Sequence, residues 1–493
     1  FNDGVNVIIG HNNAGKSNLL KALALAIDAK TPKRLEVDDF YKDGQLGDLK
    51  TKATEVTIAL TFTQSKDEDL TSDDLVTVST WLTKLTPPYE ARLTYRFFLP
   101  TSLEAKYHQT MGTVADVNEA WLRIKHDFLR LYAAKLYCGD ASLKVIADPE
   151  TIQKFDFQFL NAIRDVERDM FSGRNTLLRE VLDFFLDLNE KSKKGTGVTP
   201  DAIRAAIKAR GHDFSAKSRE LLDLLQGRMK EGKAEILAYA KETGASFDNA
   251  EPDFEGTLSE VELFSALRLI VQYETGIKIP ATHNGLGYNN LIYMSLLLAK
   301  MQVDSDGSYL ESNAKVFPLL VIEEPEAHLH PAMQYLFLKF LKKNIQENKK
   351  VRQLFVTTHS TQITSAVTLD EIICLHGLGG KIAVGYPGKV FADNPAGKKS
   401  KAYVQRFLDA TKSDMLFAKS VILVEGIAEQ LLVPVLLRYE NLPLEEHHAV
   451  VINVGGRYFE HFLHLFDGNN PNAIPKKISC ITDVDPERKL LPA

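Results

Sequence analysis

The sequence has few of the features that mark membrane or secreted proteins. None of its 493 residues lie in an apolar run approaching the roughly 18 residues that a membrane helix needs, and no signal-peptide pattern opens the chain. The three cysteines, Cys138, Cys374 and Cys480, are scattered, which fits neither a disulfide framework nor a metal-ligand cluster. We therefore expect no membrane association and a reducing, cytoplasmic environment.

An excess of positive charge is also absent. The net charge of -6 argues against a uniformly basic nucleic-acid binder, but it allows a local basic groove or an acidic site that meets phosphate through metal ions. With 25% charged and 44% apolar residues, the composition is that of a globular protein, and the length allows two or three domains. The chain begins at Phe1 without methionine and stops soon after Asp485, so we expect residues beyond both ends.

A phosphate-binding motif stands near the beginning of the chain. The β-branched run at residues 5–10 predicts a buried strand, and residues 18–27 favour a helix. Between them lies G-x-x-x-x-G-K-S, in the strand–loop–helix context that this motif requires for ATP or GTP. Lys16 would contact the β- and γ-phosphates, and Ser17 would hold Mg²⁺. The predicted nucleotide-binding residues of this loop are Gly10, Asn12, Asn13, Gly15, Lys16, Ser17 and Asn18.

Two strands and a helical region follow. Residues 55–62 and 89–99 alternate as strands do, and Gln64 is either a magnesium-sensing glutamine or a solvated loop residue. From Glu119 to about residue 255 the pattern becomes helical, with a basic loop at residues 191–198. Three apolar stripes run through it: Trp121, Ile124, Phe128 and Leu131; Leu177, Val181, Leu182, Phe185 and Leu188; and Leu221, Leu225, Met229 and Ile236. They indicate either a helix-packing core or a dimer surface, and the region is a helical insertion.

Paired carboxylates end a buried strand in the second half of the chain. Residues 317–322 predict this strand, and Glu323 and Glu324 follow it directly. In a P-loop NTPase the first carboxylate orders Mg²⁺ and the second polarises the attacking water. The strand at residues 353–358 ends at His359, which is placed to hydrogen-bond a γ-phosphate. The nearby His328 and His330 suggest a metal pair, but we interpret them as dimer contacts.

A second acidic constellation lies near the C-terminus. Strands are predicted at residues 421–424, 449–454 and 477–482, alternating with helices as in a parallel α/β sheet. Glu425, Asp483 and Asp485 follow two of these strands, and Gly426 permits a tight turn into a helix that carries Glu429. Converging strand ends would make these carboxylates hard oxygen ligands for Mg²⁺ or Mn²⁺, with Glu429 as a second-metal ligand.

The phosphate-binding motif, the paired carboxylates and the strand that ends at His359 stand in the order typical of an ATPase family. In this order they resemble the ABC-type ATPases of the structural-maintenance and RecF class. The resemblance includes a glycine turn, G-L-G-Y-N-N at residues 285–290, between the phosphate loop and the paired carboxylates. It implies two heads that sandwich ATP, with Glu324 as hydrolytic base and His359 as switch histidine. Gly285, Gly287 and Asn289 would then act on the γ-phosphate bound by the partner head. Glu323 stands where this class usually has aspartate.

The C-terminal constellation resembles the Toprim domain of primases, topoisomerases and some nucleases. Joined to the ATPase through D-M-L-F-A-K-S-V-I-L-V-E-G at residues 414–426, it is similar to the OLD (overcoming lysogenisation defect) nuclease family, which includes Gabija and some retron anti-phage nucleases. The implied fold class is α/β: an ABC-type P-loop ATPase head with a helical insertion, followed by a C-terminally incomplete Toprim domain. The expected boundaries are residues 1–100, 101–255 (insertion), 256–375, 376–415 (connector) and 416–493 (Toprim).

The resemblance implies an ATP-regulated, Mg²⁺- or Mn²⁺-dependent DNA endonuclease or nickase of anti-phage defence. Its catalytic residues would be Glu324, His359, Glu425, Asp483 and Asp485. The expected partners are DNA, further copies of the chain through the heads and the insertion, and a defence-system protein or nucleic acid. The alternative is a repair-type DNA-binding ATPase whose Toprim domain only docks. A primase or topoisomerase is disfavoured, because no zinc-ribbon cysteines accompany the Toprim-like segment.

Overall fold

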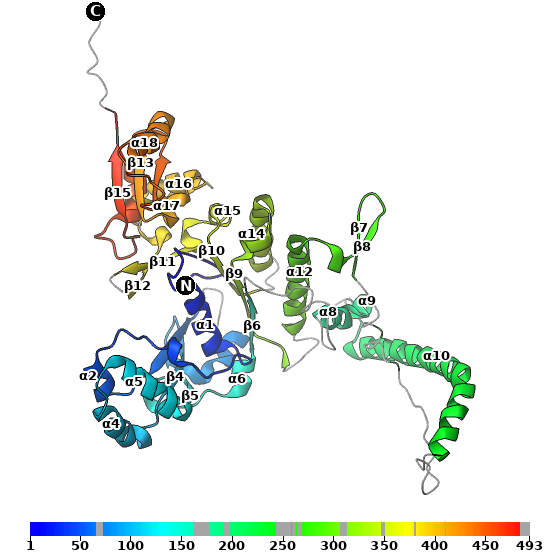
Figure 1. Cartoon of the computed structure of the whole chain (residues 1–493). Helices are drawn as coiled ribbons and strands as arrows, with labels where there is room; N and C mark the ends of the chain where they lie inside the picture. Colours follow the sequence, from blue (N-terminus) through cyan, green and yellow to red (C-terminus); the bar gives the residue numbers. More distant parts are fainter. Residues whose placement is uncertain are drawn as a thin grey trace, which may run out of the picture. The chain divides into compact units, whose positions relative to one another are not determined.

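The structure is a computed structural model with two compact units (Figure 1). It describes residues 1–65, 72–161, 177–191, 198–242, 258, 263, 269–305, 313–346, 351–378, 381–409 and 411–483. One unit comprises Phe1–Arg164 with Asp304–Ala493, and the other comprises Asp165–Val303.

A six-stranded sheet forms the centre of the first unit, in the order β12-β11-β1-β10-β9-β6 (Figure 1). Its strands are β1 (Val5–Ile9), β6 (Phe155–Leu160), β9 (Phe317–Glu323), β10 (Gln353–Thr358), β11 (Ile372–Leu378) and β12 (Lys381–Gly385). All neighbours are parallel except β12, which runs antiparallel to β11. All five residues of β1 and the first six of β9 are buried, as expected for strands covered on both faces.

A smaller antiparallel sheet packs its apolar face toward the same core. It contains β2 (Val56–Thr63), β3 (Leu82–Lys84), β4 (Glu90–Phe98) and β5 (Ala133–Cys138). Helix α1 (Lys16–Ile27) contributes Leu20 and Leu23 to this core. A stack of rings lies in the core: Phe155 lies 5.7 Å from Trp81 and 4.5 Å from Phe317 between ring centroids. The surrounding helices are α2 (Leu46–Thr51), α3 (Asp73–Thr77), α4 (Glu104–Gly112), α5 (Val117–Arg123) and α6 (Pro149–Gln153).

The strands predicted at residues 5–10, 55–62 and 89–99 are confirmed as β1, β2 and β4. The helical insertion predicted from residue 101 is wrong in its first part, because β5 and β6 lie within it. Strand β6 reads F-D-F-Q-F-L, an alternation of period two, and it pairs in parallel with β9, from Phe155 opposite Phe317. The compact second unit begins only at Asp165.

The second unit is mostly helical in its described residues. It contains α8 (Leu177–Phe185), α9 (Leu188–Lys191), the 43-residue α10 (Pro200–Glu242), β7 (Ile270–Gln272), β8 (Lys278–Pro280) and most of α12 (Leu286–Asp304). The apolar stripe predicted on α10 is exposed: Leu221, Leu225, Met229 and Ile236 are between 42% and 63% accessible. Within the described residues these side chains do not enter a core, and the dimer surface stays a prediction. Most of the predicted basic loop lies outside the described residues.

A third, parallel sheet follows in the first unit, in the order β14-β13-β15. It is formed by β13 (Ser420–Val424), β14 (Ala449–Asn453) and β15 (Lys477–Ile481), as predicted for this segment. The helices of this half of the chain are α14 (Pro331–Gln346), α15 (Thr361–Ser365), α16 (Pro395–Phe407), α17 (Asp414–Phe417), α18 (Ile427–Tyr439) and α19 (Phe459–Leu463). No helix in the described part of the chain is long and apolar enough to cross a membrane.

Candidate functional sites

The phosphate-binding loop at residues 10–17, called the phosphate cradle below, lies at the carboxyl edge of the large sheet. Gly10 follows β1, and Gly15 has a φ of 89°, in the left-handed region that favours glycine. The turn delivers Lys16 and Ser17 to the beginning of α1, where unpaired backbone N–H groups and the helix dipole favour an anion. The Lys16 ammonium donates to the carbonyl oxygens of Gly10 at 3.1 Å and His11 at 3.3 Å. The predicted strand, loop and helix are therefore in place to bind phosphate.

The paired glutamates have different surroundings. Glu323 ends β9, and its carboxylate accepts a hydrogen bond from the Ser17 hydroxyl. This hydroxyl and carboxylate are oxygen donors of the kind that Mg²⁺ prefers, so the residues fit the metal predicted for them. Glu324 has a φ of 44°, in the left-handed region, so the chain leaves the strand conformation of β9 at this residue. The left-handed backbone at a non-glycine residue is the local strain expected of a functional position.

His359 lies between Glu324 and the cradle. Its Nε2 lies 2.7 Å from the Lys16 ammonium and 3.3 Å from Oε1 of Glu324. Because the ammonium only donates, the imidazole nitrogen accepts from it. Burial and the neighbouring Lys16 lower the pKa of His359, which favours this neutral ring. Burial also lowers the pKa of Lys16, against the pull of the carboxylates of Glu324, Glu326 and Glu323.

Two further residues of this edge were missed by the sequence analysis. Glu326 accepts the backbone N–H of His359 at 2.6 Å, so it fixes the loop that carries the histidine. Asn161 follows β6, and the register of Leu160 opposite Ile322 places it level with Glu323. The signal for Asn161 was the period-two pattern of β6, which predicts a strand end at this point.

The glycine turn at the beginning of α12 lies in the second unit. The Gly285 carbonyl accepts the backbone N–H groups of Tyr288 at 3.0 Å and Asn289 at 3.2 Å, which closes the turn. The Asn289 side chain is fully buried and donates to the Asn284 carbonyl at 3.4 Å. It therefore stabilises its own turn in this conformation, and the contact in trans predicted for it would need the turn to open. The roles of Gly285 and Gly287 stay predictions.

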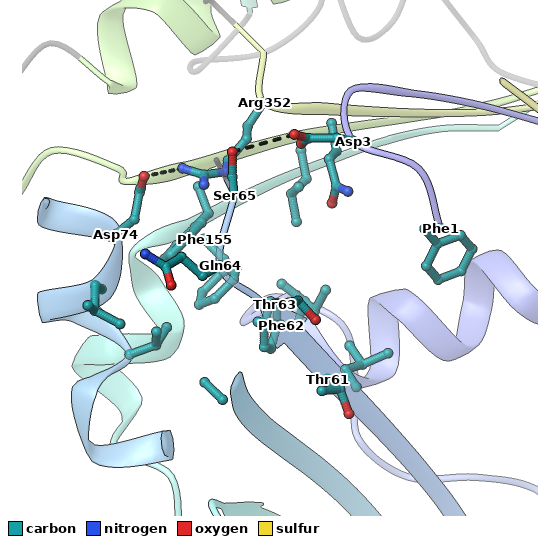
Figure 2. Close-up of a pocket in the computed structure, with 18 of the residues that line it drawn as sticks. Phe1, Asp3, Thr61, Phe62, Thr63, Gln64, Ser65, Asp74, Phe155 and Arg352 are labelled. Carbon is teal, nitrogen blue, oxygen red and sulfur yellow. Dashed lines mark hydrogen bonds and ion pairs between the residues drawn. The ribbon is translucent and has the colours of Figure 1, made fainter. Parts of the chain in front are cut away.

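A cavity of about 410 Å³ lies away from this chemistry (Figure 2). Its wall includes Asn2 and Asp3, which precede β1, whereas the cradle follows β1. Gln64 lines the same cavity, and its Oε1 accepts the Tyr89 N–H at 3.1 Å. A five-residue strand spans about 16 Å, so Gln64 does not reach Ser17. The interpretation of Gln64 as a magnesium sensor is wrong.

The C-terminal acidic site forms where β13 and β15 end side by side. Val424 lies opposite Ile481 in the parallel register, so Glu425 and Thr482 are the next pair. The Thr482 hydroxyl donates to the Glu425 carboxylate, and Nε of Arg457 lies 3.4 Å from the same oxygen. These hydrogen bonds from Thr482 and Arg457 lower the pKa of Glu425. The predicted convergence of Glu425 and Asp483 at one sheet edge is thereby reproduced.

The remaining predicted metal ligands are less well placed. Glu429 accepts the Gly426 N–H at 2.9 Å, which makes it a capping residue of α18. Asp485 lies outside the described residues. Within the described ranges no group of three or more His, Cys, Asp or Glu side chains is gathered as a metal site. The metal roles of Glu425, Glu429, Asp483 and Asp485 therefore stay predictions. His330, which precedes α14, accepts the Ala332 N–H of that helix at its Nδ1, at 3.3 Å.

The hairpin of β11 and β12 packs against the phosphate cradle. A Cβ atom on Gly10 would collide with the carbonyl oxygen of Leu375 in β11. A Cβ atom on Gly15 would collide with the side chain of Ile382 in β12. Both strands of the hairpin thus fill the space behind the loop that would bind phosphate.

The far end of the same hairpin packs against the loop that leads into β15. A Cβ atom on Gly385 would lie 3.1 Å from Cγ1 of Ile474 and 3.2 Å from the Ala473 carbonyl oxygen. The Tyr386 N–H donates to the Asn472 carbonyl at 2.7 Å. One hairpin therefore touches the cradle and the segment that carries the second acidic site.

Gly10→Ala should destabilise the protein by about 1–3 kcal/mol, because the new methyl group meets a backbone carbonyl that cannot rotate away. Thermal unfolding measures this effect. Gly47→Ala is the matched control, since a Cβ atom on Gly47, in α2, meets no atom within 4 Å. Equal melting temperatures for Gly10→Ala and the wild type would contradict the contact with Leu375.

Two family descriptions match the chain. The AAA ATPase domain family matches residues 1–364. The description "overcoming lysogenization defect protein-like, TOPRIM domain" matches residues 416–485, which contain β13, β14 and β15.

Two curated relatives carry nuclease names. An endonuclease GajA of Bacillus cereus (strain HuB5-5) is 28% identical over 242 residues, which cover 44% of this chain and 32% of that protein. An OLD nuclease of Thermus scotoductus is 23% identical over 196 residues, which cover 39% of this chain and 34% of that protein. The chain thus spans about a third of the length of these relatives.

Among solved structures, an Smc head domain from Pyrococcus furiosus has 14% identity and a TM-score of 0.37, covering 77% of this chain and 89% of that one. A score this low carries no argument about this chain.

Proposed function

We propose, from the premise that the chain belongs to the AAA ATPase domain family and carries an OLD-like TOPRIM domain, that it is an ATP-regulated, metal-dependent DNA endonuclease. The nuclease names of its relatives support a nucleic acid as the substrate, and the resemblance to the OLD family supports DNA and a role in defence against phage. Mg²⁺ or Mn²⁺ is the proposed metal, because the candidate ligands are hard oxygens.

The observation that carries this proposal is the presence of two acidic strand ends with different neighbours. Glu323 and Glu324 face a glycine loop and a buried lysine, which suit the compact phosphates of a nucleotide. Glu425 is contacted instead by the Thr482 hydroxyl, the Arg457 guanidinium and the backbone N–H of Gly456. The Arg457 side chain is 58% exposed, which suits a long polymer at the surface.

The two sites would use their residues differently. Ser17 and Glu323 would hold the metal that accompanies ATP, and Glu324 would take the proton of the attacking water. Glu425, Asp483 and Asp485 would hold the nuclease metal. When bound there, a divalent metal stabilises negative charge on a phosphodiester and activates water.

A second copy of the chain is part of the proposal. The exposed apolar stripe on α10 supports a dimer surface, since a stripe of this length is rarely left in water. Gly285 and Gly287 would complete the nucleotide site of the partner.

Regulation by ATP is supported by the β11–β12 hairpin. Phosphate in the cradle must replace the bonds that Lys16 makes to Gly10, His11 and His359. A shift of the loop reaches β12 through Ile382, because the side chain fills the space next to Gly15. The other end of β12 contacts the segment that precedes β15. We expect nucleotide binding to move that segment.

Ile382→Ala should weaken the effect of ATP on DNA cleavage at least about twofold while ATP affinity stays within about threefold of wild type, because it removes the contact without touching a phosphate ligand. Cleavage with and without ATP, and hydrogen exchange at residues 470–476, measure the coupling. Val384→Ala, on the same strand and also exposed, is the control. An unchanged ATP effect in Ile382→Ala would contradict this route.

Nicking of a supercoiled plasmid by the intact protein, in Mg²⁺ or Mn²⁺ and with or without ATP, tests the function as a whole. We expect metal-dependent nicking whose rate changes with ATP. Hydrolysis of ATP that DNA stimulates, with no strand scission in either metal, would instead support a repair-type ATPase with a docking TOPRIM domain.

A further inference from the structure

The loop that follows β14 folds back over the end of β13. The Val454 N–H donates to the Val424 carbonyl at 2.9 Å, and the Gly456 N–H donates to the Glu425 carbonyl at 2.8 Å. Gly455 has a φ of 78° and Gly456 a φ of 125°, so both adopt backbone that favours glycine. This path brings Arg457 to the gap between the ends of β13 and β15.

At this position Arg457 bridges the ends of β13 and β15. Its Nε lies 3.4 Å from Oε1 of Glu425, and its Nη2 donates to the Asp483 carbonyl oxygen at 3.2 Å. The guanidinium is thus the positive group nearest to the predicted metal ligands among the contacts of Glu425. A carboxylate and a carbonyl that attract one cation are the kinds of oxygen that also suit a divalent metal.

The bridge contributes little to the stability of the fold. The Arg457 side chain is 58% exposed, and ion pairs at such exposed positions contribute little to folding stability. A guanidinium carries five N–H donors. Its planar fork matches the two oxygens of a phosphate group. Arg457 therefore has the position and the chemistry to bind a phosphate at the acidic edge.

We propose that Arg457 binds the scissile phosphate of DNA and, before DNA arrives, holds Glu425 at the edge of the sheet. The proposal rests on the nuclease function proposed above and adds a residue to it. A metal held by Glu425 would displace the guanidinium from the carboxylate oxygen, and the N–H groups of Arg457 would then donate to the phosphodiester. The positive charge of Arg457 thus competes with metal but assists cleavage.

This dual role predicts opposite effects on two measurements. Arg457→Ala should slow plasmid nicking by about tenfold to a hundredfold, the loss of one or two charge-assisted hydrogen bonds. Binding of Mn²⁺, measured by calorimetry without DNA, should be as tight as in the wild type or tighter, because a competing cation is gone. Arg457→Lys should recover part of the nicking, since it keeps the charge but loses the fork.

Arg438→Ala is the matched control, because Arg438 is an exposed arginine of the same domain paired with Glu445 at 3.3 Å. It should change neither measurement. Nicking by Arg457→Ala at the wild-type rate would overturn the proposal while leaving the nuclease function standing. Weaker Mn²⁺ binding together with a lower melting temperature would make Arg457 a structural brace and also overturn it. Absence of nicking by the wild type would remove the nuclease function and this proposal together.

Discussion

Glu324→Gln should reduce ATP hydrolysis by about 10²- to 10⁴-fold while ATP binding stays within about threefold of wild type. The amide cannot take a proton from the attacking water, but it has nearly the volume of the carboxylate. Lys16 and Ser17, which would contact the phosphates and the metal, are unchanged. We therefore expect a nucleotide-bound protein that accumulates as a head dimer.

Single-turnover hydrolysis, nucleotide affinity and the molar mass in the presence of ATP measure these effects. Glu326→Gln is the matched control, because it makes the same change of charge two residues away. Its amide oxygen can still accept the His359 N–H, a bond of 2.6 Å in the wild type. Loss of hydrolysis in Glu326→Gln as large as in Glu324→Gln would contradict the assignment of the base.

Glu425→Ala should lower DNA nicking at least about 100-fold, because it removes the carboxylate on which the second site is centred. ATP hydrolysis should be unchanged, since the large sheet holds its own carboxylates. Nicking and hydrolysis are measured on the same preparation. Glu445→Ala, an exposed glutamate of the same domain, should leave both rates at the wild-type level.

Together the two substitutions test whether the sites are chemically separate. Glu324→Gln should leave Mn²⁺ binding at the TOPRIM site intact, and Glu425→Ala should leave ATP turnover intact. Metal binding lost in Glu324→Gln, or nicking retained in Glu425→Ala, would refute the division between nucleotide and phosphodiester chemistry.

The sequence predicted the cradle well because its determinants are local. Lys16 and Ser17 are fixed by the turn that contains them, and Glu323 directly follows an apolar run. Parallel strands then bring Gly10, Glu323 and His359 to one edge, as the alternation of strands and helices implies. No long-range knowledge was needed for these residues.

Other residues depend on contacts that no local pattern encodes. Arg457 lies in a loop whose path is set by Gly455 and Gly456, and its partners are 32 and 26 residues away. For Gln64 the sequence leaves two alternatives open, because its strand predicts an ending but not which edge of the core that ending faces. The strands β5 and β6 were missed because apolar residues at helical spacing flank them on both sides.

The pairing of β1 has a consequence for how the chain folds during synthesis. This strand lies between β10 and β11, and Val5 pairs with Leu354, about 350 residues later in the chain. A ribosome adding about 5–20 residues per second needs roughly 20–70 s to make that length. Throughout this interval β1 has neither of its neighbouring strands, although all five of its residues are buried in the native sheet. The strand that carries the phosphate loop is therefore exposed to misfolding and aggregation for longer than the strands that complete it.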